Sequence, residues 1–189
     1  MIRTKKSNPS NPSTPTLLDY AILGLIQDSG RSGYNIRKVF ETTALGTYSS
    51  SPGSIYPALT RLQRNGYVVK KTVEKSKKAR FHITETGLEI LKTWLLKPVE
   101  REDIAKHREE LLLRFAFMES LLTGEQKITF LKDFQSHLRA YLRELRAYHE
   151  AEATSLPLHG KLSFEHGIAS CQTTLNWCTK AIRSFESPA

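Results

Sequence analysis

The sequence has little cysteine and no long hydrophobic run. Its 189 residues include two cysteines, Cys171 and Cys178, which a helix would hold about 10 Å apart along its axis, too far for a disulfide bond. No apolar segment approaches the roughly 18 residues that a membrane helix needs. The N-terminus is positively charged but lacks the apolar core of a signal peptide. We therefore expect a chain that contacts no membrane and resides in the cytoplasm.

Enzyme motifs are missing as well. The sequence contains no Gly-x-Ser-x-Gly, no Walker loop and no dinucleotide fingerprint. His159, His166 and the two cysteines lie near one another in the chain, but their spacing matches no familiar zinc pattern. Both cysteines fall on an apolar helical seam, which favours their interpretation as small buried hydrophobic residues. We predict a protein that is not an enzyme and uses no metal or cofactor.

Acidic residues are scarce in the first half of the chain. Residues 1–96 contain 15 lysines and arginines and six acidic residues, a net charge of +9, whereas residues 97–189 contain 13 of each. Between residues 61 and 80, eight basic residues accompany Glu74 alone. Solvated surfaces usually mix the two signs, so this concentration indicates a phosphate-binding face. The alternative is a basic surface that only confers solubility.

The basic cluster surrounds a short amphipathic helix. Its apolar residues follow the i, i+3, i+4, i+7 spacing that gives a helix one buried face: Ile55, Ala58, Leu59 and Leu62. Ser51 or Ser54 is expected to cap its start, and Asn65-Gly66 its end.

The segment after this helix has the composition of two β-strands, at residues 67–73 and 79–83, joined by a polar lysine-rich turn. A short helix followed by a basic hairpin is typical of a winged helix. In that fold the helix enters the major groove of DNA, and the hairpin reaches the backbone or the neighbouring minor groove.

Several motifs in this region resemble the PadR family of bacterial transcription regulators. They are Ser51-x-Gly53-Ser54-Ile55-Tyr56-Pro57-Ala58-Leu59-x-x-Leu62-x-x-x-Gly66-Tyr67-Val68, Leu23-Gly24-Leu25-Ile26, Ser32-Gly33-Tyr34-Asn35-Ile36 and Ile83-Thr84-x-x-Gly87. The resemblance covers about residues 16–96. The chain departs from the family at Phe81, where a tyrosine is usual, and in the wing, which has lysines in place of the common Gly-Arg start. The resemblance implies binding to double-stranded DNA, and repression rather than activation.

The candidate DNA-binding residues lie on the polar face of the short helix, beside it and on the wing. They are Tyr34, Ser51, Ser54, Tyr56, Thr60, Arg61, Arg64, Lys70, Lys71, Lys75, Lys77, Lys78 and Arg80. Arg61 and Arg64 are expected to read bases or to clamp phosphates. The hydroxyl-bearing residues are expected to set the register through phosphates, and the lysines to add affinity that is independent of sequence.

Composition divides the chain into three parts. Residues 1–13, rich in Pro, Ser and Asn, are expected to form a disordered basic tail. Residues 14–98 are expected to form the winged helix and residues 99–189 a helical dimerisation domain, which makes the fold mainly α. Within these parts we expect Thr14 or Thr16 and Ser32 to start helices, residues 44–50 to be extended and residues 99–106 to be a connection.

Two long helices are predicted in the second half, each with an apolar seam spaced alternately by three and four residues. The first seam contains Leu131, Phe134, Leu138, Tyr141 and Leu145, and the second Ile168, Cys171, Leu175, Cys178, Ile182 and Phe185. Two such seams form an antiparallel hairpin. One short companion helix would leave this hairpin poorly covered, so we expect a two-fold homodimer with contacts from both seams and from Leu17 and Leu18. Residues 164–168 and Leu175-x-Trp177 resemble the C-terminal domain of virulence activators of the AphA type, which implies the same.

Four aromatic residues are candidates for an effector pocket, because the family resemblance implies binding of small aromatic molecules in this region. They are Trp94, Phe115, Phe117 and Trp177, and packing in a hydrophobic core is the alternative for each. For the whole protein two alternatives stay open. One is a winged helix that binds another protein, and the other is a ligand sensor that binds no operator.

Overall fold

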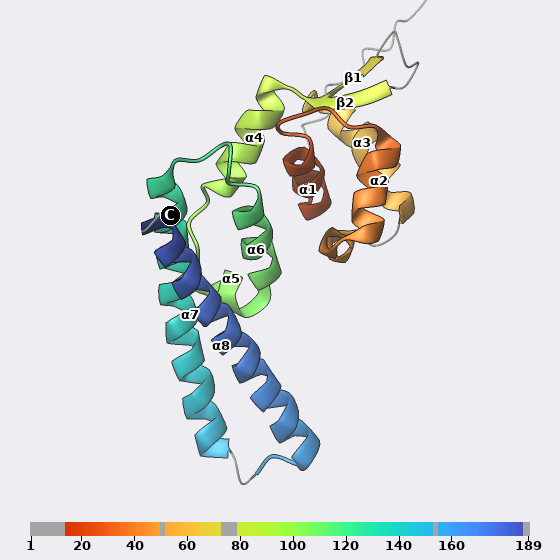
Figure 1. Ribbon diagram of the computed structural model, residues 1–189. Helices are drawn as coiled ribbons and strands as arrows, with labels where there is room; N and C mark the ends of the chain where they lie inside the picture. The colour runs from red at the N-terminus through yellow and green to blue at the C-terminus, as the bar shows by residue number, and fades with distance from the viewer. Residues whose placement is uncertain (1–13, 50–51, 73–78, 153–154, 187–189) are drawn as a thin grey trace, which may run out of the picture. The chain divides into compact units, whose positions relative to one another are not determined.

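The computed structural model describes residues 14–49, 52–72, 79–152 and 155–186, and the chain forms two compact units (Figure 1). The expected tail at residues 1–13 lies outside the described residues. The fold is mainly α with a two-stranded antiparallel sheet, as the sequence predicts. The division between the units falls between Leu91 and Lys92, whereas the sequence places the boundary after residue 98. No helix of the described residues is long and apolar enough to cross a membrane.

Three α-helices precede the sheet in the described residues of the first unit. They are α1 (Leu17–Leu25), α2 (Gly33–Thr42) and α3 (Ile55–Arg64). Thr16 caps α1 in a reciprocal capping box with Asp19, and the Ser32 hydroxyl caps α2 by accepting from the backbone N–H of Asn35 at 3.1 Å. Gly66 ends the α3 region with a φ of 76°, a left-handed conformation that glycine adopts without steric cost. The starts of α1 and α2 and the end of α3 confirm the predictions. At the start of α3 the Ser54 side chain makes no capping hydrogen bond, and Ser51 lies outside the described residues.

The segment between α2 and α3 differs from the prediction. Residues 44–48 were expected to be extended, but they form a short 3-10 helix, η1 (Ala44–Tyr48), followed by η2 (Pro52–Ser54). The hydroxyl of Thr43 accepts from the backbone N–H of Leu45 at 3.3 Å and starts η1. A side chain that caps a turn thus overrides the weak helix preference of a Ser/Thr-rich segment.

The wing consists of β1 (Val68–Thr72) and β2 (Ala79–Ile83), paired so that Val68 lies opposite Ile83. Arg31 adds an isolated bridge, since its backbone exchanges two hydrogen bonds with Phe81 at 3.1 and 2.8 Å. The sheet is followed by α4 (Glu85–Leu95). Gly87 allows α4 to lie against β1, because a Cβ there would come within 2.2 Å of the carbonyl oxygen of Tyr67.

The second unit contains four further helices, α5 (Arg101–Lys106), α6 (Arg108–Ala116), α7 (Gly124–Glu152) and α8 (Leu158–Glu186). The prediction that residues 99–106 form only a connection is wrong. They include α5, which packs against α7 and buries Ile104 completely. Glu100 and Asp103 form a capping box at its start, so the acidic residues that suggested a loop are the ones that cap the helix.

The two long helices form the expected antiparallel hairpin and lie side by side (Figure 1). Its seam is closed within one chain, because Leu131, Phe134, Leu138, Cys171 and Cys178 are all fully buried without a second copy. Burial against a partner cannot remove further apolar area of these side chains from water. The sequence assignment of these five residues to dimer contacts is therefore corrected: they hold the hairpin itself together.

The other expected dimer residues are less buried. Ile182 is buried, whereas Leu17, Leu18, Tyr141, Leu145, Ile168 and Leu175 are half-buried and Phe185 is exposed. A surface for a second copy has to come from these side chains or from residues outside both seams.

Candidate nucleic-acid interface and ligand cavities

A hollow of about 860 Å³ opens between the N-terminus of α2, the exposed face of α3 and the wing. We call it the wing groove. It is lined by Ser32, Gly33, Tyr34, Asn35, Tyr56, Leu59, Thr60, Gln63, Lys70, Ala79, Arg80 and Phe81. Five of these residues are candidates from the sequence: Tyr34, Tyr56, Thr60, Lys70 and Arg80. The structure thus brings residues from three separate segments to one concave surface.

Two tyrosines stand at the wing groove with exposed rings. Tyr34 retains 58% of its surface and Tyr56 51%. Gly33 lets the start of α2 approach the ring of Tyr56, because a Cβ there would lie 2.8 Å from Cε1. The guanidinium of Arg37 lies 5.8 Å from the ring centre of Tyr34. An exposed phenol is a hydrogen-bond donor that suits a phosphate oxygen.

The two cations of the wing groove are positioned by the wing. The Lys70 ammonium lies over the ring of Phe81, 5.9 Å from the ring centre, and the lysine stays exposed. Arg80 donates one bond to the carbonyl oxygen of Gly30 at 3.4 Å, which leaves the other N–H groups of its guanidinium for a ligand. Lys70 and Arg80 are thus both exposed to solvent, and each is held by a contact with a neighbouring residue. Lys71 and Arg64 are exposed as well.

The candidates from the sequence did not include two amide side chains of the wing groove, Gln63 and Asn35. Gln63 is exposed on α3, one turn beyond Thr60, and Asn35 is exposed at the start of α2. Thr60 donates its hydroxyl proton to the carbonyl oxygen of Tyr56 at 3.0 Å, so its hydroxyl can only accept from a ligand. Asn and Gln are the side chains that bind adenine with two bonds. The helical spacing of Tyr56, Thr60 and Gln63 was the signal that could have identified Gln63.

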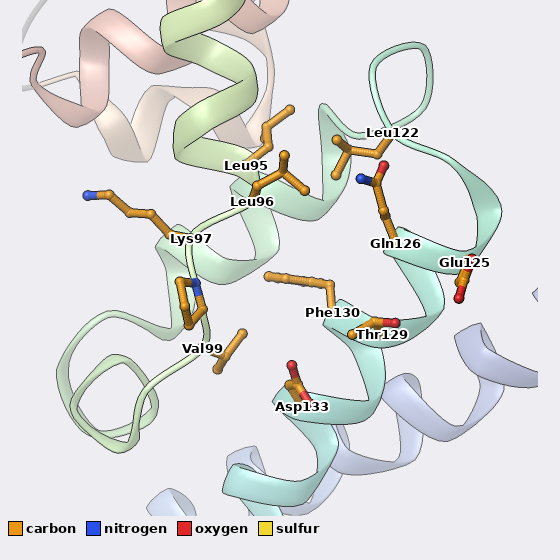
Figure 2. A pocket seen from close by; sticks show the side chains of 11 residues that line it. Leu95, Leu96, Lys97, Val99, Leu122, Glu125, Gln126, Thr129, Phe130 and Asp133 are labelled. Carbon is orange, nitrogen blue, oxygen red and sulfur yellow. The ribbon is translucent and has the colours of Figure 1, made fainter.

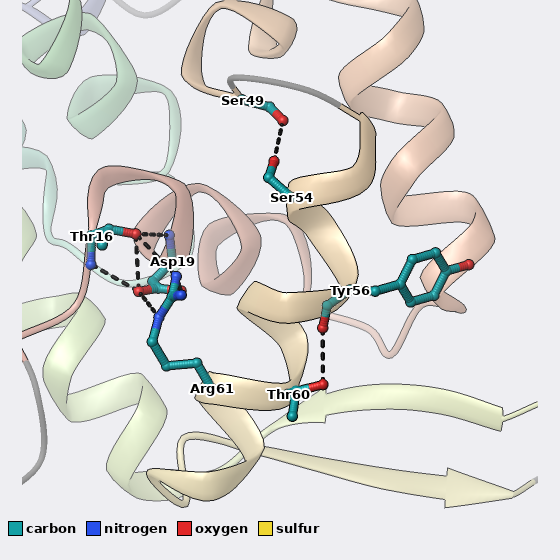
Figure 3. A network of polar contacts seen from close by, with 7 residues as sticks. All are labelled: Thr16, Asp19, Ser49, Ser54, Tyr56, Thr60 and Arg61. Atoms are coloured by element: carbon teal, nitrogen blue, oxygen red, sulfur yellow. Dashed lines mark hydrogen bonds and ion pairs between the residues drawn. The ribbon is translucent and has the colours of Figure 1, made fainter.

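Arg61 lies on a different side of α3 from Tyr56 (Figure 3). Its guanidinium donates to both carboxylate oxygens of Asp19, at 3.0 and 2.7 Å. Asp19 is 1% exposed and also accepts from the backbone N–H and the hydroxyl of Thr16, at 2.8 and 3.0 Å. The bidentate pair joins α3 to the start of α1. The structure therefore gives Arg61 a structural role, and we do not retain it as a reader of bases.

The remaining candidates fall into two groups. The hydroxyl of Ser54 is hydrogen-bonded to that of Ser49 at 2.8 Å, next to the first turn of α3 (Figure 3). Ser51, Lys75, Lys77 and Lys78 lie outside the described residues. Their role in DNA binding stays a prediction.

The four aromatic candidates for an effector pocket all belong to the second unit. Phe115 and Trp177 are in contact, with ring centres 5.1 Å apart in an edge-to-face arrangement. Trp94 is fully buried and donates its indole N–H to the Glu110 carboxylate at 2.9 Å, and Phe117 is buried in the core. The structure thus supports core packing for Trp94 and Phe117, and leaves Phe115 and Trp177 as candidates.

Two of the cavities lined by described residues belong to the second unit. One of about 230 Å³ lies between the end of α4 and the start of α7, with Leu95, Leu122 and Phe130 among its apolar walls (Figure 2). The other, of about 350 Å³, is lined by Phe115, Ala116, Met118, Glu119, Lys127 and Phe185. We call the second one the aromatic cavity.

A buried arginine supports the wall of the smaller cavity. Arg114 is 2% exposed and donates to the carbonyl oxygens of Leu95, at 3.0 Å, and Lys97. Its guanidinium lies 5.0 Å from the ring centre of Phe130, a cation–π arrangement. Burial lowers the pKa of Arg114 from its usual value, since water no longer stabilises the charge. Arg114 therefore holds the end of α4 by satisfying carbonyl groups that a helix leaves open.

The two cysteines have the environment of core residues. Burial raises the pKa of the Cys178 thiol to about 12, so it is protonated at neutral pH. Arg108 approaches the sulfur of Cys171 at 2.8 Å. Among the described residues no group of three or more His, Cys, Asp and Glu side chains is placed to hold a metal ion.

A winged helix with exposed polar residues and cations around its third helix is typical of one class of DNA-binding protein. The sequence profile of the Transcriptional regulator PadR-like family matches residues 22–93, and that of the Virulence activator alpha C-term matches residues 107–186. The chain belongs to the PadR-like family of transcriptional regulators and has a C-terminal domain of the virulence-activator type. The members of this family are regulators and not enzymes.

Individual relatives show how far the similarity extends. The negative transcriptional regulator PadR of Bacillus subtilis is 28% identical over 146 residues, which are 75% of this chain and 79% of that protein. The transcriptional regulator YqjI of Escherichia coli is 31% identical over 91 residues, which are 48% of this chain and 42% of YqjI. Among solved structures, Bacillus subtilis PadR in complex with operator DNA is 23% identical, with a TM-score of 0.40 over 89% of this chain and 99% of that one.

Proposed function

We propose that this protein is a dimeric, sequence-specific repressor that binds a pseudo-palindromic DNA operator and is released by a small aromatic effector. The observation that carries the proposal is the wing groove. It combines an exposed recognition helix, hydrogen-bonding side chains and fixed cations on one surface. Base edges are read by the first two features, and phosphates are bound by the third.

Each part of the wing groove has a role in this proposal. α3 has ten residues, a length of about 15 Å, and fits the major groove of B-form DNA with its polar face. Gln63 and Asn35 are the side chains for adenine, and Thr60 can accept from an amino group. Lys70 and Arg80 face the phosphates, with Tyr34 and Tyr56 as hydroxyl donors. Base discrimination on this surface thus comes from uncharged residues.

The dimer is supported by apolar side chains that the single chain leaves exposed on α8. Leu158 retains 66% of its surface and Leu162 53%, and the two lie one helical turn apart on the same face. Nearby, Tyr148 stacks on Phe164 with ring centres 5.5 Å apart. A second copy related by a two-fold axis would cover this surface and place two recognition helices on successive major grooves.

Different observations support repression and support release from DNA by an effector. Repression is supported by the similarity to a negative regulator that covers 79% of that protein. An aromatic effector is supported by the contact between Phe115 and Trp177 beside the aromatic cavity. We place the protein in the cytoplasm, where its operator would be.

Replacing Lys70 and Lys71 together with alanine is expected to weaken binding to every duplex and to reduce the salt dependence. Each lysine that neutralises a phosphate contributes a slope of about −0.9 to the plot of log K against log salt concentration. The double variant should therefore lose up to about 1.8 from the slope. Fluorescence anisotropy with an operator fragment, selected by the protein from genomic DNA, gives this slope.

The matched control is Lys161→Ala with Lys180→Ala, which removes the same charge from α8. Its slope should equal that of the wild type. An unchanged slope in the Lys70 and Lys71 variant would contradict the assignment of the wing. If the purified protein does not bind duplex DNA at low salt, the result would favour its interpretation as a protein-interaction module or a ligand sensor.

Replacing Leu158 and Leu162 with glutamate is expected to convert the dimer into a monomer. Two carboxylates on each partner would have to be buried at the interface, which costs several kcal/mol per ion. Sedimentation equilibrium should show the mass of one chain, while far-UV circular dichroism stays unchanged because both residues are exposed in the single chain. Ser163→Glu, at an exposed position on the same helix, is the control. A variant that stays dimeric would place the interface elsewhere.

A further inference from the structure

We infer that Gln63 makes operator binding sensitive to methylation of adenine at N6, so that the protein binds tightly to DNA without this modification. Gln63 is exposed in the last turn of α3 and lines the wing groove. The inference rests on the proposed binding of an operator, and it names the chemical form of DNA that the wing groove selects.

Gln63 belongs to a stripe of α3 that faces the wing groove. Tyr56, Thr60 and Gln63 follow one another at spacings of four and three residues, and all three line the groove. The three side chains are exposed, Tyr56 with 51% of its surface. A helix that enters the major groove presents such a stripe to the edges of the bases. The Gln63 amide is therefore placed for contact with a base.

The oxygen atoms of this stripe can accept protons from the amino groups of bases. The Thr60 hydroxyl donates its own proton to the carbonyl oxygen of Tyr56 at 3.0 Å, so it can only accept from a base. The Gln63 amide has an acceptor oxygen beside a donor nitrogen, an arrangement that matches N6 and N7 of adenine. Among the described residues that line the groove there is no Asp or Glu, the usual partners of the cytosine amino group. Adenine is therefore the base that best fits Gln63.

Methylation at N6 removes the proton that this contact needs. In a duplex one N6 proton pairs with thymine, so a methyl group on N6 has to point to the other side, toward N7 and into the major groove. There it replaces the proton that the Gln63 oxygen would accept, and it blocks the approach of the amide nitrogen to N7. Both hydrogen bonds are lost, and a bidentate contact of this kind is worth at least about fivefold in affinity.

Apolar residues of the wing groove make the expected sensitivity specific to the amino group. Leu59, Ala79 and Phe81 line the groove beside its polar residues, and Leu59 and Phe81 are buried. Thymine carries a methyl group at C5 in the major groove, and apolar side chains are suitable contacts for it. A methyl group at C5 of cytosine occupies the same place. We therefore expect the protein to tolerate 5-methylcytosine and to reject N6-methyladenine.

The test is a fluorescence anisotropy titration of the full chain with operator duplexes that carry N6-methyladenine at one adenine at a time. We expect the modification to weaken binding about fivefold or more at one position or several. At one such position Gln63→Ala should bind the modified and unmodified duplexes equally, whereas Asn35→Ala should retain the difference. Gln172→Ala removes an amide from α8 and should behave like the wild type. Because Gln63 and Asn35 are exposed, far-UV circular dichroism should stay unchanged in both variants.

The outcomes separate this inference from the proposed function. A scan without any sensitive adenine would overturn the inference, and so would a difference that persists in Gln63→Ala at every sensitive adenine. An equal loss from 5-methylcytosine would mean that the groove rejects any added methyl group, which contradicts the role of the amide. In these cases tighter binding of the unmodified operator than of a scrambled duplex would still support the proposed function. If the wild-type protein does not distinguish these two unmodified duplexes, the proposed function fails and the inference fails with it.

Discussion

Replacing Arg61 with alanine is expected to lower the free energy of unfolding of the winged-helix unit by about 3 kcal/mol. The Asp19 carboxylate is 1% exposed and would keep only its bonds from Thr16. A buried charge that loses its partner destabilises by 3–5 kcal/mol, and we take the lower end because Arg61 is 35% exposed. Urea denaturation followed by far-UV circular dichroism measures the change.

A double-mutant cycle separates the ion pair from other effects. Asp19→Ala removes the capping box of α1, and the freed guanidinium can turn to solvent, so we expect a loss of about 2 kcal/mol. The variant with both substitutions should be destabilised by less than the sum of the two, with a coupling of at least about 1 kcal/mol. Arg64→Ala, an exposed arginine in the last turn of the same helix, is the control and should change stability by less than about 0.5 kcal/mol. Additive effects would contradict a coupled pair.

The same variants decide whether Arg61 contacts DNA. If Arg61 acts through Asp19, then Arg61→Ala and Asp19→Ala should weaken operator binding to a similar extent at low temperature, where both are folded. If the guanidinium instead leaves Asp19 to read a base, Arg61→Ala should lose discrimination between operator and random DNA, by about 1–3 kcal/mol, while Asp19→Ala keeps it. Anisotropy titrations with the two duplexes distinguish these results.

Local signals in the sequence predicted the elements of the fold. Thr16 and Ser32 start α1 and α2 because a side-chain oxygen within three residues satisfies the first N–H groups, and this requires no knowledge of the rest of the chain. The spacing of the seams predicted the α7–α8 hairpin for the same reason, because one helical face is determined by its own residues. Residues 68–72 and 79–83 likewise formed strands on their composition.

Partners distant in the sequence were not predictable in this way. Arg61 lies on the polar face of α3, and nothing local indicates that a buried carboxylate 42 residues earlier occupies it. Seam residues such as Leu138 are apolar whether they face the same chain or a second one, so spacing alone could not assign them. Gln63 was not among the candidates, because the sequence does not show that its side chain lines the same hollow as Tyr56 and Thr60.

Replacing Arg114 with alanine is expected to destabilise the second unit by about 3–4 kcal/mol. The substitution leaves the carbonyl oxygens of Leu95 and Lys97 without their donor, removes the contact with the Phe130 ring and opens a cavity in the core. An unsatisfied buried acceptor costs about 1–3 kcal/mol, and the loss of a buried charge offsets part of the total. Thermal unfolding monitored by circular dichroism and by tryptophan fluorescence measures the change.

Arg114→Lys tests the geometry of this interaction. Lysine keeps the charge, but a single ammonium lacks the planar fork that serves two carbonyl groups and a ring at once. We expect it to recover less than half of the stability lost in Arg114→Ala, whereas Arg139→Ala, at an exposed position on α7, should change stability by less than about 0.5 kcal/mol. Full recovery with lysine would mean that charge alone holds the end of α4. In that case the planar guanidinium would not be required to hold the segment between α4 and α5.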